Sequence, residues 1–274
     1  MELLTATKIR ELARRHGLNP SKALGQNFVI DPNTIRRIVR LAEVTAGDRV
    51  LEVGAGLGTL TLGLADLADH VVAVELDKFL IPALREVMGA ADNVRIVNAD
   101  AMDLDFEGLG CDKMVSNLPY NVATPLVAKL LSKAPSISTF VFMVQKEVGA
   151  RMVAGPGSRT YGGISVRVAY HCEAKVLGTV PASVFWPAPK VASALVWMKR
   201  RPHPRVAIDE SLLMRVVKAA FSQRRKTATN SIASSLGLPV STVEGAFVTV
   251  DIDPMRRAES LGLEEFAKLA AELS

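Results

Sequence analysis

Short apolar runs alternate with helical patterns over residues 49–200, and no other feature of the sequence constrains the fold as strongly. The runs are almost continuous in β-branched and other apolar residues, as expected of strands that helices cover on both faces. Because helical stretches such as 78–88 and 123–131 separate them, they are predicted to form a doubly wound α/β sheet. The five predicted strands are 49–55, 71–76, 94–99, 113–118 and 139–145.

Two later runs, 173–180 and 192–200, are also predicted to be strands, and only a loop separates them. Strands that are joined without a helix pair antiparallel, whereas parallel neighbours need a crossover. The sheet is therefore expected to have seven strands, with its last pair antiparallel.

A proline-bearing linker, RPHPR at 201–205, precedes a part of the chain that has helical patterns only. This boundary predicts two domains, residues 1–204 and 205–274. Asp209 and Ser241 are suited to helix N-caps, and Gly237 is suited to a helix end. The predicted helices are 209–221, 227–236, 240–248 and 263–273.

Positive charge is concentrated in one stretch of the chain. The net charge is +5, but residues 199–226 hold nine cations and two acids, whereas 227–274 hold three cations and seven acids. A positive band beside an acidic module favours a surface for a polyanion, and a merely solvated surface is the alternative. The candidates at the end of the band are Arg224, Arg225 and Lys226.

Other features bear on where the protein works. No run of 18 apolar residues is present, so no spanning helix is expected, and residues 1–17 lack the apolar segment of a secretory signal. Cys111 and Cys172 have no metal-type spacing and are expected to be free thiols in a reducing compartment. The sequence predicts a cytoplasmic protein with no membrane contact and no metal site.

The segment LEVGAGLGTLT, residues 51–61, follows a predicted strand and opens a helix. Gly54 and Gly56 allow a tight turn and the close approach of a ligand, which the first N–H groups of the helix would face. Glu75 ends the next strand, 21 residues after Gly54, where its carboxylate can accept both hydroxyls of a ribose. These features suit a nicotinamide dinucleotide equally well, and a ligand-free turn is the alternative.

The segment NADAMDLDF, residues 98–106, narrows the choice of ligand. Asp100 stands just past the third strand, where it can accept an adenine amino group, and Ala101 is predicted to contact the same ligand. No arginine beside the glycines awaits a pyrophosphate, and the acids Asp48 and Glu52 are compatible with a sulfonium cation. The predicted cofactor is therefore S-adenosylmethionine, and an Asp100 that only caps a turn is the alternative.

The fourth strand ends in the segment NLPY, residues 117–120, at the sheet edge where α/β proteins place their chemistry. An adenine N6 amine is a poor nucleophile, because its lone pair is conjugated into the ring. The side-chain oxygen of Asn117 and the backbone carbonyl of Pro119 can accept its two N–H groups and draw the lone pair out of the plane. Tyr120 can stack on the base, so the segment predicts N6 methylation; an ordinary proline turn is the alternative.

An N6 amine within paired nucleic acid is reached only when the base is extruded. The segment FWPAPKVASALV, residues 185–196, is predicted to supply the opposite wall of the base pocket. Phe185 is expected to sandwich the base against Tyr120, and Lys190 is expected to meet a phosphate. The alternative is that the two aromatic residues Phe185 and Trp186 cap the core.

Seven motifs in this order resemble the KsgA-type family of ribosomal RNA adenine N6,N6-dimethyltransferases, over nearly the whole chain. They are KALGQNF (22–28), LEVGAGLGTLT (51–61), VELD (74–77), NAD (98–100), NLPY (117–120), FWPAPKVASALV (185–196) and FSQRRKTATNS (221–231). The resemblance implies a Rossmann-like class I methyltransferase sheet with a small all-helical C-terminal domain. It adds Asn27 and Val29 to the cofactor site, and Val29 stands where many members have leucine.

The resemblance also implies the reaction. Members of this family transfer methyl groups from S-adenosylmethionine to two neighbouring adenosines, in the hairpin loop near the 3′ end of 16S rRNA. Each adenosine receives two methyl groups, and the substrate is an immature 30S subunit rather than naked RNA. The helical module with FSQRRK would be the ribosome-docking domain, and a monomer is expected.

Two other readings of the sequence stay open. The antibiotic-resistance enzymes that modify large-subunit rRNA share the fold and the loop at 117–120, although FSQRRK and PKVASALV favour the small-subunit type. A non-catalytic assembly or transcription factor descended from such an enzyme is a third possibility. The intact set Asn117, Pro119 and Tyr120 argues against a loss of chemistry.

Overall fold

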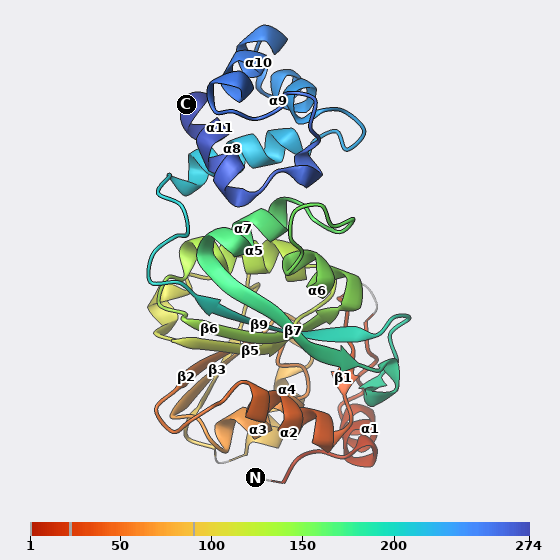
Figure 1. Cartoon of the computed structure of the whole chain (residues 1–274). Helices are drawn as coiled ribbons and strands as arrows, with labels where there is room; N and C mark the ends of the chain where they lie inside the picture. Colours follow the sequence, from red (N-terminus) through yellow and green to blue (C-terminus); the bar gives the residue numbers. More distant parts are fainter. Residues whose placement is uncertain (1, 22–23, 90) are drawn as a thin grey trace. The chain divides into compact units, whose positions relative to one another are not determined.

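The computed structural model describes residues 2–21, 24–89 and 91–274 (Figure 1), so Lys22 and Ala23 of the KALGQNF motif lie outside the described residues. The chain forms two compact units. The sheet unit comprises residues up to 149 together with 175–200, and the helical unit comprises 150–174 with 201–274. Residues 150–174 therefore pack with the C-terminal helices, which the boundary predicted at 204/205 did not anticipate.

The sheet has seven strands in the order β4-β3-β2-β5-β6-β9-β7. Strands β2 to β6 pair parallel with one another, and β9 pairs antiparallel with β6. The predicted sheet is thereby confirmed. The strands are β2 (Arg49–Val53), β3 (His70–Glu75), β4 (Val94–Asn98), β5 (Lys113–Asn117), β6 (Thr139–Gln145), β7 (Cys172–Val180) and β9 (Ser193–Arg200).

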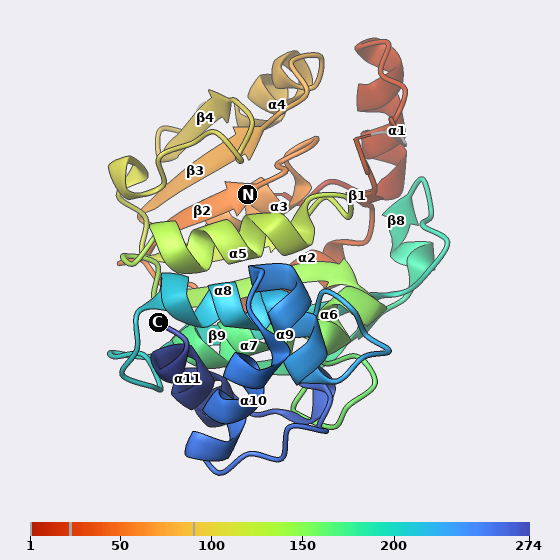
Figure 2. The ribbon, with the colours of Figure 1, turned by 90° about the horizontal axis from the view of Figure 1, so that it is seen from above.

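Helices cover both faces of this sheet, which explains its continuous apolar runs. Helices α2 and α3 lie on one face and α5 lies on the other (Figure 1; Figure 2 gives the second view). The residues of β3 from 71 to 74 and of β6 from 140 to 144 are almost completely buried. The helices of this unit are α1 (Ala6–Arg15), α2 (Pro32–Leu41), α3 (Thr59–Ala65), α4 (Ile81–Met88) and α5 (Ala123–Lys133), and α6 (Lys146–Met152) passes from it to the helical unit.

The order of the strands reverses between β2 and β5. From β2 the chain continues outward to β3 and β4, and it then returns to place β5 on the other side of β2. Loops that leave adjacent strands in opposite directions open a crevice at the carboxyl edge, which is where open α/β sheets bind ligands. The topology alone therefore places a binding site after β2 and β5.

A second, two-stranded ladder was not predicted. Strand β1 (Phe28–Val29) pairs antiparallel with β8 (Phe185–Trp186), with Phe28 opposite Trp186 and Val29 opposite Phe185. The ladder fastens the N-terminal segment to the loop before β9. Strands of two residues have no detectable periodicity, so a sequence pattern cannot reveal them.

The helical unit has a core of its own, which includes Tyr161, Leu213, Phe247 and Phe266. Asp209 caps α8 as predicted, and Gly237 ends α9 in the left-handed region. The predicted N-cap Ser241 is wrong, because α10 begins two residues earlier after Pro239. The helices are α7 (Gly163–His171), α8 (Glu210–Ala220), α9 (Ala228–Leu236), α10 (Val240–Thr249) and α11 (Leu263–Glu272).

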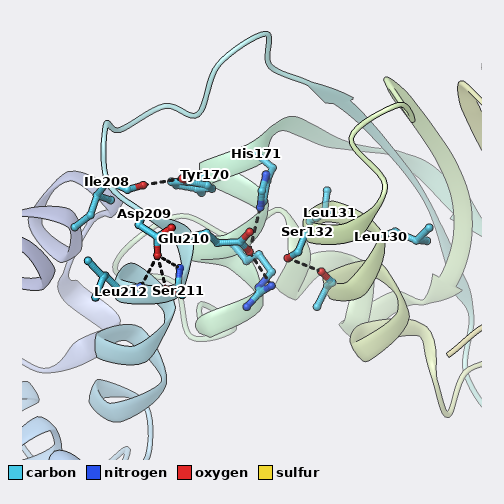
Figure 3. A network of polar contacts seen from close by, with 12 residues as sticks. Leu130, Leu131, Ser132, Tyr170, His171, Ile208, Asp209, Glu210, Ser211 and Leu212 are labelled. Carbon is cyan, nitrogen blue, oxygen red and sulfur yellow. Dashed lines mark hydrogen bonds and ion pairs between the residues drawn. The ribbon is translucent and has the colours of Figure 1, made fainter. Parts of the chain in front are cut away.

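Polar contacts join α7 to the start of α8 within this unit (Figure 3). The Tyr170 hydroxyl donates to the carbonyl of Ile208 at 2.8 Å, and Glu210 forms ion pairs with Arg167 and His171. None of the described helices of either unit is long and apolar enough to cross a membrane.

Candidate active site

A cavity opens at the carboxyl ends of the central strands of the sheet unit, where the strand order reverses. Its volume is about 990 Å³ including the open mouth. The loops after β2, β3, β4 and β5 line it together with the N-terminal segment 24–29. The structure thus brings together the residues predicted for cofactor and catalysis: Asn27, Val29, Gly54, Gly56, Glu75, Asp100, Ala101, Asn117, Pro119 and Tyr120.

The glycine loop after β2 is packed too closely for side chains. Gly54 has φ +80°, and a Cβ there would lie 3.1 Å from the ring of Pro119. Gly56 has φ +58°, and a Cβ there would lie 2.9 Å from the ring of Phe28. The left-handed conformation and the close contacts both demand glycine, so this loop packs against the loop after β5 and the N-terminal segment as well as lining the cavity.

Glu75 is held firmly at the end of β3, where 6 % of the residue is exposed. One carboxylate oxygen accepts the N–H of Gly56 at 2.7 Å, and the other accepts the N–H of Asp77 at 2.9 Å. Burial raises the pKa of Glu75 above its ordinary value. Each oxygen keeps a lone pair, so the carboxylate can still accept hydroxyl groups from a ligand in the cavity.

Asp100 is exposed at the cavity wall beyond β4, and Ala101 beside it is buried. Its Oδ1 accepts the N–H of Met102 at 2.7 Å, so it does cap a turn, as the alternative reading supposed. No hydrogen bond of the described residues is recorded for Oδ2, which suits it to accept an amino group. The two readings of Asp100 are therefore compatible.

Asn117 ends β5, and the orientation of its side-chain amide is fixed. Its Nδ2 donates to the backbone carbonyl of Asn27 at 2.9 Å. Its Oδ1 is buried and has no hydrogen-bond partner among the described residues. A buried acceptor without a partner costs free energy, on the order of 1–3 kcal/mol. Such an atom at the wall of a cavity is an acceptor that awaits a donor from a ligand.

Pro119 and Tyr120 follow in the same loop. Among the described residues, the Pro119 carbonyl accepts one long hydrogen bond, 3.3 Å from the N–H of Val122, so it retains capacity for a second donor. The hydroxyl of Tyr120 lies 2.6 Å from Oγ of Ser193, and burial raises the pKa of Tyr120. The structure therefore places both predicted acceptors and the aromatic ring on one short loop.

Five of the predicted substrate contacts do not line this cavity. Phe185 is 3 % exposed and packs in the core with Val29 and Ile35, so its predicted place as the opposite wall of the base pocket is not supported. The pairing of β8 with β1 turns its ring inward. Lys190 is exposed on the loop before β9. Arg224, Arg225 and Lys226 are exposed in the helical unit, where Arg224 donates to the carbonyl of Arg159.

Of the two acids that were expected near a sulfonium cation, Asp48 lies away from the cavity and Glu52 lines it. Asp48 lies before β2, at the opposite end of that strand from the cavity, and forms an ion pair with Lys113 at 2.8 Å. Glu52 does line the cavity, but it is 1 % exposed and its Oε2 has no partner among the described residues. Burial raises the pKa of Glu52 to about 8, and the charge of Glu75 adds to the effect. Burial thus favours the uncharged form of Glu52.

Glu52 should make stability depend on pH. Its pKa is about 8 in the folded protein, against an ordinary value of 4.5, so between these values only the unfolded chain has lost the proton. The free energy of unfolding should therefore fall as the pH rises through this window, on the order of 1 kcal/mol per pH unit. Urea unfolding of the wild type and of Glu52→Gln from pH 5 to 9 measures it. Two parallel stability curves would contradict the prediction.

Three contacts that hold the site together were not predicted from the sequence. The Gln26 side chain donates to Asp77 at 2.8 Å and so ties the N-terminal segment to the loop after β3. The other two are the hydrogen bond that the Asn117 amide donates to the Asn27 carbonyl and the hydrogen bond between the hydroxyls of Tyr120 and Ser193. Backbone carbonyls leave no trace in a sequence, and a single serine has no distinguishing pattern. Among the described residues, no three His, Cys, Asp or Glu side chains lie together as metal ligands would.

The fold and the site define a class I methyltransferase. A family model described as ribosomal RNA adenine dimethylase matches residues 17–274, and the chain belongs to that family. The ribosomal RNA small subunit methyltransferase A of Kineococcus radiotolerans is 46% identical, with 98% of this chain and 91% of that protein covered. The protein of the same name from Moorella thermoacetica is 45% identical, with 96% and 95% covered.

Two solved structures support the assignment. A dimethyladenosine transferase from Plasmodium falciparum is 25% identical with a TM-score of 0.75, covering 87% of this chain and 94% of that one. The 23S rRNA methyltransferase ErmE is 27% identical with a TM-score of 0.65, covering 90% and 99%. The predicted family, fold class and rRNA adenine dimethyltransferase activity dependent on S-adenosylmethionine are confirmed.

Proposed function

We propose that this protein dimethylates N6 of two adjacent adenosines in the hairpin loop near the 3′ end of 16S rRNA. It would act as a monomer in the cytoplasm, on an immature 30S subunit. The relatives named for the small subunit are 45–46% identical over nearly the whole chain, whereas ErmE is 27% identical, which favours the small subunit as substrate. The observation that carries the chemistry is the buried Oδ1 of Asn117, which has no hydrogen-bond partner in the part of the chain that the structure describes.

The residues around the cavity fit S-adenosylmethionine. The glycine loop has no side chain to obstruct a ligand, and Glu75 and Asp100 are acceptors that suit ribose hydroxyls and an adenine amino group. The residues that would hold it are Asn27, Val29, Gly54, Gly56, Glu75, Asp100, Ala101 and Asn117. When bound, it supplies a methyl group on a sulfonium. An uncharged Glu52 would give up its proton more readily beside such a cation.

The chain's own residues activate the nitrogen. Before the first transfer, Oδ1 of Asn117 and the carbonyl of Pro119 accept the two N–H groups of the amine, so the nitrogen lone pair leaves the plane of the purine ring. The monomethylated amine keeps one N–H, which one of these two acceptors would hold for the second transfer. The carbonyl of Asn27 prevents the Asn117 amide from flipping, which keeps an oxygen rather than an NH₂ group toward the amine. The nitrogen would form its new C–N bond as the bond between the methyl group and sulfur breaks, with the electron pair left on a neutral thioether sulfur. The nitrogen would then lose one proton to solvent, so no strong base is needed. Positioning and fixed dipoles supply the rate.

The helical unit would dock on rRNA. Arg224, Arg225 and Lys226 are exposed on the turn between α8 and α9, where they can meet phosphates. Charges of this kind add affinity without sequence information, so they would place the enzyme on the subunit while the loop at 117–120 selects the base.

Mass spectrometry of rRNA from cells that lack this protein tests the proposal. Dimethyladenosine near the 3′ end of 16S rRNA should disappear, and large-subunit rRNA should be unchanged. The wild-type gene should restore the modification, whereas a gene with Asn117→Ala should not. A loss of dimethyladenosine from large-subunit rRNA instead would establish the resistance-type function. Unchanged rRNA of both subunits would indicate a non-catalytic factor.

A further arm of the same experiment tests the docking surface. A gene with Arg224, Arg225 and Lys226 changed to glutamate should restore much less dimethyladenosine than the wild type. A matched gene changes the same number of exposed cations of the sheet unit, Arg40, Arg85 and Lys133, and should restore it fully. Equal restoration by both would remove the three cations from the interface.

A further inference from the structure

The hydroxyl of Tyr120 makes a contact that the proposed chemistry does not use. It lies 2.6 Å from Oγ of Ser193, whose exposed fraction is 0 %. The two residues are 73 positions apart in the sequence. Tyr120 belongs to the loop after β5, and Ser193 is the first residue of β9. This hydroxyl pair therefore joins the loop after β5 to a strand that is distant in the sequence.

Ser193 is a rigid anchor. It pairs with Gln145 in the antiparallel ladder of β6 and β9, and next to it the N–H of Lys146 donates to the carbonyl of Ala192 at 3.0 Å. Because β6 lies between β5 and β9, the hydrogen bond between Tyr120 and Ser193 reaches across the width of β6. The loop fixes one end of the Tyr120 side chain, and the strand fixes the other.

The backbone of the same loop is also restrained from the opposite direction. Gly25 of the N-terminal segment lies so close that an added Cβ would be 3.3 Å from the backbone N of Tyr120. The side chain of Tyr120 is partly exposed at the cavity wall, although its hydroxyl is hydrogen-bonded to Ser193. The ring is therefore held in one orientation with a surface left for contact.

We propose that Ser193 is a positioning residue, whose hydroxyl holds the Tyr120 ring in the orientation on which the substrate adenine stacks. The inference rests on the proposed function, since the ring needs an extruded base to stack on. A ring that is free to rotate must be ordered at every turnover, and this ordering opposes the reactive alignment. The hydroxyl of Tyr120 thus acts on the reaction only through Ser193.

Turnover of small ribosomal subunits at saturating S-adenosylmethionine tests this inference. Tyr120→Phe keeps the ring and removes its hydroxyl, and Ser193→Ala removes the partner. Each should lower kcat about 3- to 10-fold, as expected for the loss of one hydrogen bond. The double variant should be no slower than either single variant, because both remove the same contact. Ser193→Thr, which keeps a hydroxyl, should recover most of the rate.

The controls separate positioning from stability. Tyr170→Phe removes a comparable hydroxyl bond, to the Ile208 carbonyl in the helical unit, and should lower the melting temperature without changing kcat. Cofactor affinity by calorimetry should be the same in the wild type and in Tyr120→Phe. This inference alone is overturned if the wild type is active and Tyr120→Phe has an equal or higher kcat. It is also overturned if the losses of kcat in the two single variants add up in the double variant. A wild type that methylates no small subunits overturns the proposed function as well.

Discussion

Replacing Asn117 by alanine is expected to lower the rate of methyl transfer about 100- to 1,000-fold, the usual cost of removing one preorganised acceptor or donor from an active site. Oδ1 of Asn117 is buried and accepts from none of the described residues, so its dipole is already aimed and costs no reorganisation during the reaction. A single-turnover assay with labelled S-adenosylmethionine and small subunits measures the rate. Subunit binding, measured by sedimentation, should persist.

The matched control is Asn93→Ala. The Asn93 side chain donates to the carbonyls of Ala65 and Ala68, away from the cavity lining. Its loss should lower stability and leave the transfer rate within about twofold of the wild type. Near-normal turnover by Asn117→Ala would refute the acceptor role and, with it, the proposed mechanism.

Asn117→Asp tests the orientation of the amide more sharply than alanine does. A carboxylate at this position cannot donate to the Asn27 carbonyl, which Nδ2 now contacts at 2.9 Å. The ionised side chain should therefore turn away, whereas the protonated acid could donate to Asn27 and present its other oxygen. Residual activity of this variant should rise as the pH falls, and that of Asn117→Ala should not. Identical pH profiles would contradict the role of Asn27.

The sheet could be predicted because its central strands are buried on both faces. The stretches 71–74 and 140–144 are apolar throughout, and their burial leaves few other structures open to them. The ends of the elements were less certain. The helix predicted from residue 78 begins at Ile81, because Asp77 accepts the N–H of Phe79 and delays the first turn.

The site could be predicted only in part, since spacing locates residues along the chain and not their partners. Parallel strands bring their carboxyl ends together, so Glu75, Asp100 and Asn117 could be placed at one edge. Phe185 was expected to face the base because prolines and loop residues surround it, and the short pairing with β1 turned it into the core. Residues 150–174 likewise joined the helical unit through long-range packing that no local pattern encodes.

Glu75→Ala is expected to weaken the binding of S-adenosylmethionine about 10- to 100-fold, because hydrogen bonds to a charged group contribute roughly 1.5–3 kcal/mol. Isothermal titration calorimetry measures the affinity. The matched control is Glu107→Ala, since the Glu107 carboxylate accepts from Ser136 outside the cavity lining, and its affinity should equal that of the wild type. Unchanged affinity of Glu75→Ala would dismiss the ribose contact.

The pH dependence of binding separates a direct role of Glu75 from a structural one. The carboxylate also accepts the N–H groups of Gly56 and Asp77, so alanine loosens the glycine loop as well as removing a ligand contact. Burial raises the pKa of Glu75, so its protonation begins at a higher pH than for an exposed glutamate. A protonated carboxyl is a poorer acceptor, and wild-type affinity should therefore fall as the pH is lowered through this pKa.

Glu75→Gln keeps an acceptor for the loop and cannot titrate, so its affinity for S-adenosylmethionine should be lower than that of the wild type at neutral pH and should not change through the same range. A wild-type affinity that does not change on acidification would leave Glu75 a support of the loop and assign the ribose to other residues.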